Sequence, residues 1–165
     1  MKNKSTKLTI STDFEMYDSI DALPAEDQEL LKKAQKAVKQ AYAPYSNFNV
    51  GAAVLMQNGK TVIGNNQENA AYPSGLCAER VALFYANANY PKVGVKSIAI
   101  TVKSNLQVIT EPVTPCGSCR QVISEYENLF ESPIRIIMSG EKGKILVSYS
   151  IGNLLPFMFN KKHLK

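Results

Sequence analysis

Residues 49–65 read NVGAAVLMQNGKTVIGN and predict the hairpin on which the fold is built. Residues 49–57 are apolar enough to form a strand, and residues 60–65 return as its partner. The pair Asn58-Gly59 between them is a favoured two-residue hairpin turn. Because the strands of a hairpin are antiparallel, any sheet that contains this one is not wholly parallel.

Strands and helices alternate through the rest of the chain. Three further strands are predicted at residues 95–103, 133–138 and 144–149. Helices are predicted from Leu23-Pro24 to about Tyr42, from Cys77 to about Tyr90 and from Cys116 to about Tyr126, with a short one near residues 152–155. This order predicts a layered α/β domain with a mixed sheet.

The N-terminal residues carry a separate strand pattern. Leu8, Ile10, Phe14 and Met16 alternate with polar residues across residues 8–16, which predicts a half-buried strand at an edge of the sheet. No apolar signal segment precedes this pattern, and no run approaches the roughly 18 apolar residues of a membrane span. We therefore expect no membrane partner.

Composition and charge exclude several other classes of protein. The chain has 165 residues, of which 45% are hydrophobic and 20% charged, as in an ordinary globular domain. The net charge of +5 comes from six terminal lysines, and without them 13 basic and 14 acidic residues leave −1. Because a nucleic-acid site needs basic charge on its folded surface, we expect no nucleic-acid partner. The six are Lys2, Lys4, Lys7, Lys161, Lys162 and Lys165.

Three cysteines without a secretory signal favour a reducing compartment, and we expect a cytoplasmic protein. Cys77, Cys116 and Cys119 each lie at the start of a predicted helix, where free N–H groups stabilise thiolates. His163, in the basic tail, is a poor fourth ligand, so three thiolates and water would make an open, catalytic type of zinc site. A redox CxxC pair and inert buried thiols are the alternatives.

Glu79 follows Cys77 by two residues. On its own, it is an ordinary exposed helix residue. Together, Cys77-Ala78-Glu79 and Pro115-Cys116-Gly117-Ser118-Cys119 match the three-cysteine form of the zinc deaminase signature, in which this glutamate is the acid/base and not a ligand. The pattern therefore favours catalytic zinc.

With these motifs in place, the sequence resembles the small tetrameric cytidine deaminases from about residue 28 to residue 160. The resemblance implies a three-layer α/β/α sandwich with a five-stranded mixed sheet, and a homotetramer with its active sites at subunit interfaces. The matching stretches are Tyr45–Ala53, Asn66–Tyr72, Cys77–Arg80, Pro115–Val122 and Leu154–Pro156.

The resemblance also implies a role for individual residues. Cys77, Cys116 and Cys119 would bind one zinc ion per chain, and Glu79 would shuttle protons. Asn66 and Glu68 would hold the ribose 3′-hydroxyl, Phe48 would pack beside the base, and the backbone near Ala78 would meet the pyrimidine carbonyl. Tyr72 and Phe159 would reach into a neighbouring subunit's site.

The expected reaction is hydrolysis of cytidine and 2′-deoxycytidine to the uridines and ammonia, in pyrimidine salvage. Activated water attacks C4 while Glu79 moves protons. Arg80 would donate to the thiolates and restore zinc acidity, and Arg120 would either share that role or be structural. The alternatives are a deaminase of another amino-pyrimidine nucleoside and a non-catalytic zinc-stabilised binding module.

Three parts of the chain are expected. Residues 1–22 would be an extension with a possible extra strand, residues 23–160 the deaminase-like catalytic domain, and residues 161–165 a basic tail. Near the C-terminus, Asn160, Lys161 and Lys162 depart from the family's pattern, which makes the position of Phe159 the least defined of the site assignments.

Overall fold

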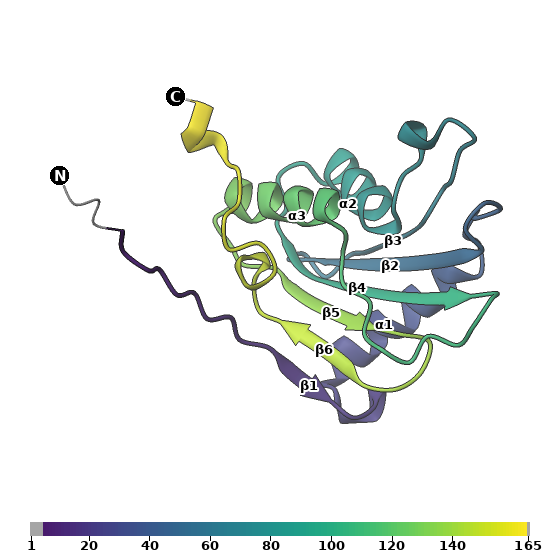
Figure 1. The fold of residues 1–165 in the computed structure, drawn as a ribbon. Coiled ribbons are helices and arrows are strands. Elements are labelled where there is room, and N and C mark those ends of the chain that lie inside the picture. The colour runs from purple at the N-terminus through teal and green to yellow at the C-terminus, as the bar shows by residue number, and fades with distance from the viewer. Residues whose placement is uncertain (1–4, 165) are drawn as a thin grey trace.

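Strands β2 (Phe48–Met56) and β3 (Thr61–Asn65) form the predicted hairpin at one edge of the sheet (Figure 1). Its loop differs from the expected two-residue turn. The Gly59 N–H donates to the Met56 carbonyl over 2.9 Å and the Met56 N–H donates to the Lys60 carbonyl over 2.8 Å, so the loop holds three residues. Gly59 has a φ of +81°, which glycine adopts without steric cost and which a three-residue hairpin requires.

The computed structural model describes residues 5–164, and its sheet has the order β1-β6-β5-β4-β2-β3. Strands β4 (Val95–Ser104) and β5 (Arg135–Ser139) are parallel, and the other neighbours are antiparallel, so the sheet is mixed as expected. The expected count of five strands is wrong. A sixth, β1 (Glu15–Tyr17), pairs with β6 (Ile145–Ser148) at the other edge.

The strand predicted over residues 8–16 is therefore much shorter than its pattern indicated. Residues 5–14 lie outside any strand, and Leu8, Ile10 and Phe14 are exposed rather than half-buried. The physical reason is that β6 spans only four residues, of which β1 pairs with three, so a strand over residues 8–16 would have almost no partner. Residues 1–4 of the expected extension and residue 165 of the expected basic tail lie outside the described residues.

Three helices complete a three-layer sandwich, as the α/β/α expectation required. Helix α1 (Ala25–Val38) covers one face, and α2 (Ala78–Asn89) and α3 (Gly117–Phe130) cover the other (Figure 1). Alternate residues of β2 point into the two cores: Ala53 and Leu55 pack with α1, and the neighbouring Val54 packs with α2. None of the helices in the described chain has the length and hydropathy to cross a bilayer.

Two helix ends differ from the sequence prediction. Helix α1 ends at Val38, not near Tyr42, because the Tyr42 N–H donates to the Asn66 carbonyl and its carbonyl accepts from the Glu68 N–H. Helix α3 continues to Phe130, beyond the predicted Tyr126. The short helix expected at residues 152–155 is a 3-10 turn at Ile151–Asn153, and further 3-10 turns lie at Ile20–Ala22, Tyr72–Ser74 and Lys161–Leu164.

Gly64 allows α2 to approach the hairpin closely. A Cβ atom at this position would lie 2.6 Å from the Ala82 nitrogen and 2.7 Å from the Ala78 carbonyl oxygen, both in the backbone of α2. Backbone atoms cannot rotate out of the way as a side chain can. The first turns of α2 can therefore pack this closely against β3 only because residue 64 has no side chain.

We therefore expect Gly64→Ala to destabilise the fold by about 1–3 kcal/mol through overpacking. Urea unfolding followed by circular dichroism would measure the loss. Gly117→Ala is the matched control, because a Cβ there meets nothing within 4 Å. Equal midpoints for the two variants would contradict the close-packing argument.

Candidate metal and substrate site

Three sulfur atoms meet where α2 and α3 begin. Cys77 is the N-cap residue of α2, Cys116 is the N-cap residue of α3, and Cys119 lies in the first turn of α3. The Cys77 and Cys116 sulfurs are 3.8 Å apart, those of Cys116 and Cys119 are 3.5 Å apart, and all three lie within 4.8 Å of one another. Two sulfurs about 2.3 Å from one tetrahedral ion are about 3.8 Å apart.

This spacing fits zinc and does not fit a disulfide, whose sulfurs lie about 2.05 Å apart. All three cysteines are free. Zinc is therefore held by Cys77, Cys116 and Cys119. His163 is not part of this cluster, and its ring stacks on Phe159 with centroids 5.4 Å apart.

A short backbone ladder sets the position of Cys77. The Gln67 N–H donates to the Leu76 carbonyl and the Leu76 N–H donates to the Gln67 carbonyl, both over 2.9 Å. The same Gln67 forms a bridge with Tyr42 on its other side. The chain after β3 therefore continues as a narrow strip of pairing, and it delivers Cys77 to the start of α2.

Arg120 sets the position of Cys116. Its Nε donates to the Pro115 carbonyl over 2.8 Å, its Nη2 to Thr114 Oγ1 over 3.0 Å and its Nη1 to the Leu154 carbonyl over 2.9 Å. All three contacts are to oxygen atoms and none is to a sulfur. Of the two roles expected for Arg120, these contacts support the structural one: it fastens the loop that leads into α3.

Arg80 lies beside the sulfurs. Its Nη2 is 3.7 Å from the Cys77 sulfur. The neighbouring Cys119 thiol, and after it the Arg80 guanidinium, lower the pKa of Cys77 to about 5. The pKa of Cys119 is raised, because the adjacent Cys77 sulfur and burial both disfavour a second negative charge there. One thiolate is thus stable before metal binds, and a bound cation would stabilise the others.

Glu79 is buried in the first turn of α2, with 4% of its surface exposed. Burial is the main cause that raises the pKa of its carboxyl group. The side chain lines the same cavity as Cys77 and Cys116. A buried carboxyl group beside a metal site, and outside the cysteine triad, can exchange a proton with a molecule in the cavity.

The cavity has a volume of about 730 Å³, and most of the sequence-predicted residues line it. Ala78 and Cys119 are fully buried behind its wall, and Phe159 lies elsewhere. The lining also includes Tyr45, Ser46, Val113 and Thr114, for which the sequence predicts no role. Of the predicted residues, those in the lining are Phe48, Asn66, Glu68, Tyr72, Cys77, Glu79, Arg80 and Cys116.

Asn66 and Glu68 hold the rim of this cavity together. Asn66 accepts from the Val50 N–H over 2.7 Å and donates to the Phe48 carbonyl over 2.9 Å. Glu68 accepts from the Tyr45 N–H over 2.9 Å and from the Ser46 N–H over 3.3 Å, and also from the Ser46 hydroxyl. Burial alone would raise the pKa of Glu68, but these hydrogen bonds outweigh it and lower the pKa.

The sequence carries a signal for Tyr45 and Ser46, because Pro44 marks a loop that leads directly into a strand, and binding residues often lie on such loops. Tyr45 also meets the ring of Tyr72 edge-on, with centroids 6.0 Å apart. Tyr72 itself is 75% exposed. The two tyrosines therefore form one side of the cavity mouth.

Comparison with known proteins places this site in a family. Residues 24–129 match the model of the cytidine and deoxycytidylate deaminase zinc-binding region. The chain is 40% identical over 138 residues to a cytidine deaminase of Sporosarcina psychrophila, covering 83% of this chain and 93% of the relative. A cytidine deaminase of Halalkalibacterium halodurans is 39% identical over 137 residues, with 83% and 96% covered.

A solved structure agrees with these matches. The crystal structure of cytidine deaminase from Burkholderia pseudomallei superposes with a TM-score of 0.70 at 38% identity, covering 83% of this chain and 100% of that one. The cytidine deaminase of Mycobacterium tuberculosis superposes with a TM-score of 0.63 at 29% identity, covering 83% and 99%. With its fold, its three-cysteine zinc site and these matches, the chain belongs to the cytidine deaminase family.

Proposed function

We propose that the chain hydrolyses cytidine and 2′-deoxycytidine to the corresponding uridines with release of ammonia, as an enzyme of pyrimidine salvage. The observation that carries this proposal is Glu79, a buried carboxyl group with a raised pKa in the cavity that also exposes Cys77 and Cys116. A purely structural zinc domain has no use for such a group, whereas a hydrolase needs a proton carrier there.

Zinc, when bound by the three cysteines, supplies the Lewis acidity that makes water reactive near neutral pH. Glu79 accepts the proton that the water gives up and delivers it to N3 of the base. As the C4–N bond breaks, Glu79 protonates the leaving amine, so that water and cytidine become uridine and ammonia. Arg80 draws charge from the Cys77 sulfur, which keeps three thiolates from cancelling the acidity of the metal.

The rest of the cavity suits a nucleoside. Phe48 offers an aromatic side chain to the base, and the backbone of Ala78 lies at the N-terminus of α2, where an N–H can meet the pyrimidine carbonyl. Asn66 and Glu68 keep free hydrogen-bonding capacity beyond their backbone contacts, and they would hold the ribose 3′-hydroxyl. The free thiols suit a reducing compartment, and we propose a cytoplasmic location.

We also propose a homotetramer whose sites are shared between subunits. Tyr72 and Phe159 are 75% and 56% exposed, and Phe159 does not line the cavity of its own chain. Large aromatic side chains left on a surface mark a contact. Placed over a neighbour's cavity, they would exclude water from the bound nucleoside.

Replacing Glu79 by glutamine keeps the shape of the side chain and removes its titratable proton. We expect Glu79→Gln to lower turnover of cytidine roughly 10²-fold or more, because proton transfer is lost at several steps. Ultraviolet absorbance follows the conversion, and metal analysis should still find one zinc per chain. Glu125→Gln, on the exposed surface of α3, is the matched control. Near-normal turnover in zinc-loaded Glu79→Gln would contradict the mechanism, and an inactive native chain would favour the binding-module alternative.

Removing the Glu68 carboxylate tests the sugar contact. We expect Glu68→Ala to lower kcat/KM for cytidine by about 1–3 kcal/mol, or roughly 5- to 150-fold, with little effect on residual action on free cytosine. Ser46→Ala is the control, since it removes one hydrogen bond from Glu68 and leaves the carboxylate in place. If kcat/KM falls equally for cytidine and for cytosine, Glu68 only holds the rim of the cavity in place and does not contact the sugar.

Light scattering tests the assembly. At micromolar concentration we expect about four times the chain mass, because the exposed aromatic residues need a partner surface. Phe159→Ala should lower nucleoside turnover without loss of zinc, because Phe159 lies outside the cavity of its own chain and would close a neighbour's. A fully active species of one chain mass would contradict both the tetramer and the shared site.

A further inference from the structure

The loop that enters β2 carries Ser46, a cavity residue to which the proposed reaction assigns no role. Asn47 follows it with a φ of +56°, in the left-handed region that asparagine occupies more readily than most residues. This conformation is held from both sides: the Asn47 N–H donates to the Ala43 carbonyl over 3.1 Å, and its carbonyl accepts from the Asn105 N–H over 3.0 Å. The turn brings the Phe48 N–H within 3.1 Å of the Ser46 Oγ atom, to which it donates.

Ser46 therefore joins the two sides of the cavity. Its oxygen accepts from the backbone of Phe48, the residue proposed to pack beside the base. Its hydroxyl group donates to Oε1 of Glu68, the residue proposed to hold the sugar. Since a hydroxyl group has a single hydrogen, Ser46 has none left to donate to a ligand, and its part in binding is to hold Glu68.

These contacts fix what Glu68 can still bind. Burial opposes a charge on Glu68, but the hydrogen bonds from the Ser46 hydroxyl and from the Tyr45 and Ser46 N–H groups lower the pKa of its carboxyl group, so it is an ionised acceptor near neutral pH. Oε2 accepts from the two N–H groups over 2.9 Å and 3.3 Å, and Oε1 accepts from the hydroxyl. A carboxylate offers about four acceptor positions, so the described chain leaves one free, on Oε1.

Asn66 leaves the complementary group. Its Oδ1 accepts from the Val50 N–H and its Nδ2 donates to the Phe48 carbonyl, so within the described chain the second N–H of the amide is free. One acceptor on Glu68 and one donor on Asn66 match a single hydroxyl group that donates to the first and accepts from the second. A sugar substituent that accepts but cannot donate would leave the Glu68 oxygen without its partner.

Building on the proposed deaminase reaction, we propose that Ser46 is a positioning residue of the sugar site, which holds Glu68 as an acceptor for one donating hydroxyl group. The Ser46 hydroxyl ties this carboxylate to the loop that carries Phe48, so one turn of the chain sets the contacts to both base and sugar. A side chain held in this way loses less freedom when the nucleoside binds, which favours binding. The site thus selects the 3′ substituent of the sugar by its ability to donate.

Two analogues of cytidine test the direction of the hydrogen bond. 3′-Deoxycytidine lacks the hydroxyl group, and 3′-fluoro-3′-deoxycytidine carries in its place an acceptor that cannot donate. For the wild-type enzyme we expect kcat/KM for both analogues to lie roughly 5- to 150-fold below that for cytidine, because Glu68 is left without its donor in each. A fluoro analogue that is turned over as well as cytidine would overturn the role of Glu68 as an acceptor of one donating hydroxyl.

Ser46→Ala and Ser46→Thr test the positioning role in the zinc-loaded enzyme. Ser46→Ala should raise KM for cytidine roughly 2- to 10-fold, a smaller effect than that of Glu68→Ala, because the carboxylate remains but is no longer held. Its kcat for cytidine and its turnover of 3′-deoxycytidine should not change, since neither depends on the sugar hydroxyl contact. Ser46→Thr keeps the hydroxyl group and should restore the KM of wild type.

Ser150→Ala is the matched control, because Ser150 makes the same contacts away from the cavity. Its Oγ atom accepts from the N–H two residues later, on Gly152, over 3.1 Å, and its hydroxyl donates to the Glu127 carboxylate over 3.0 Å. Neither Ser150 nor Glu127 lines the cavity. We expect Ser150→Ala to keep the KM of wild type.

The outcomes separate this proposal from the deaminase proposal. If wild type deaminates cytidine, an unchanged KM in Ser46→Ala, an equal loss with 3′-deoxycytidine, an equal rise in Ser150→Ala or a failure of Ser46→Thr to restore KM would each overturn the role of Ser46 alone. A zinc-loaded wild-type chain that does not deaminate cytidine would overturn the proposed function, and this inference with it.

Discussion

The whole structure depends on bringing the N-termini of two helices to one point. Zinc–sulfur bonds of about 2.3 Å leave little tolerance, so α2 and α3 must begin within a few ångströms of each other although β4 separates them in the chain. Gly64 admits the start of α2 against the hairpin, and Arg120 fastens the loop before α3. The sheet and its connections form the rigid frame that holds the N-termini of α2 and α3 in this position.

Several polar side chains at the site also hold backbone in place. Asn66 accepts a hydrogen bond from the Val50 N–H near the start of β2, and Glu68 accepts from the N–H groups of Tyr45 and Ser46. Asn66 and Glu68 both line the cavity. A residue that is already fixed by such contacts loses little further freedom when a ligand arrives. The two arginines have different contacts: Arg80 donates to the Cys77 sulfur, and Arg120 donates only to oxygen atoms.

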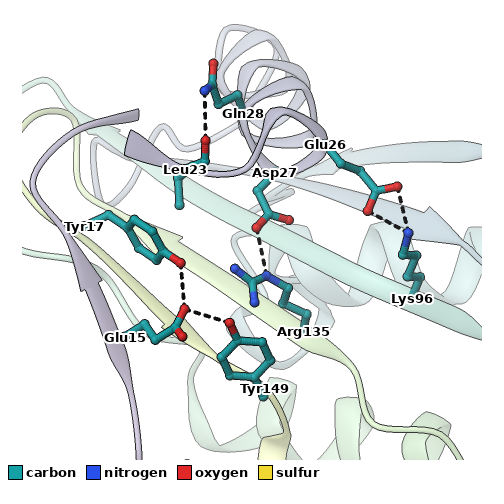
Figure 2. Close-up of polar contacts among 9 residues, drawn as sticks. All are labelled: Glu15, Tyr17, Leu23, Glu26, Asp27, Gln28, Lys96, Arg135 and Tyr149. Atoms are coloured by element: carbon teal, nitrogen blue, oxygen red, sulfur yellow. Dashed lines mark hydrogen bonds and ion pairs between the residues drawn. The ribbon is translucent and has the colours of Figure 1, made fainter. Parts of the chain in front are cut away.

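The two edges of the sheet serve different purposes. The β3 edge continues into the strip of pairing that carries Gln67 and leads to Cys77. The β1 edge lies at the opposite end of the strand order, where Glu15 accepts from the Tyr149 hydroxyl and the Arg135 guanidinium lies over the Tyr149 ring (Figure 2). A strand can therefore be added or extended at β1 without moving the zinc site, and β1 itself precedes the residues that match the deaminase model.

The sequence alone was enough for the features that depend on local pattern. Apolar runs predicted β4 and, together with Asn58-Gly59, the hairpin, and the alternation of strands with helices predicted the layered α/β class. The spacing of Cys77, Cys116 and Cys119, with Glu79 two residues after the first cysteine, predicted the zinc site, because the signature lies in residues close together in the sequence. The ends of helices and strands were harder to predict from the sequence. Helix α1 ends at Val38 because the backbone of Tyr42 forms hydrogen bonds with Asn66 and Glu68, which are far away in the sequence.

Tertiary structure alone decided the rest. Only the assembled chain showed that Arg120 contacts oxygen atoms and Arg80 a sulfur, since each arginine follows a zinc-binding cysteine within three residues in the sequence. It also decided that the pattern over residues 8–16 forms a strand only at Glu15–Tyr17, because strand formation needs a partner and β6 provides only a short one. A periodic pattern states which face of a segment is apolar, and the fold determines whether anything lies against it.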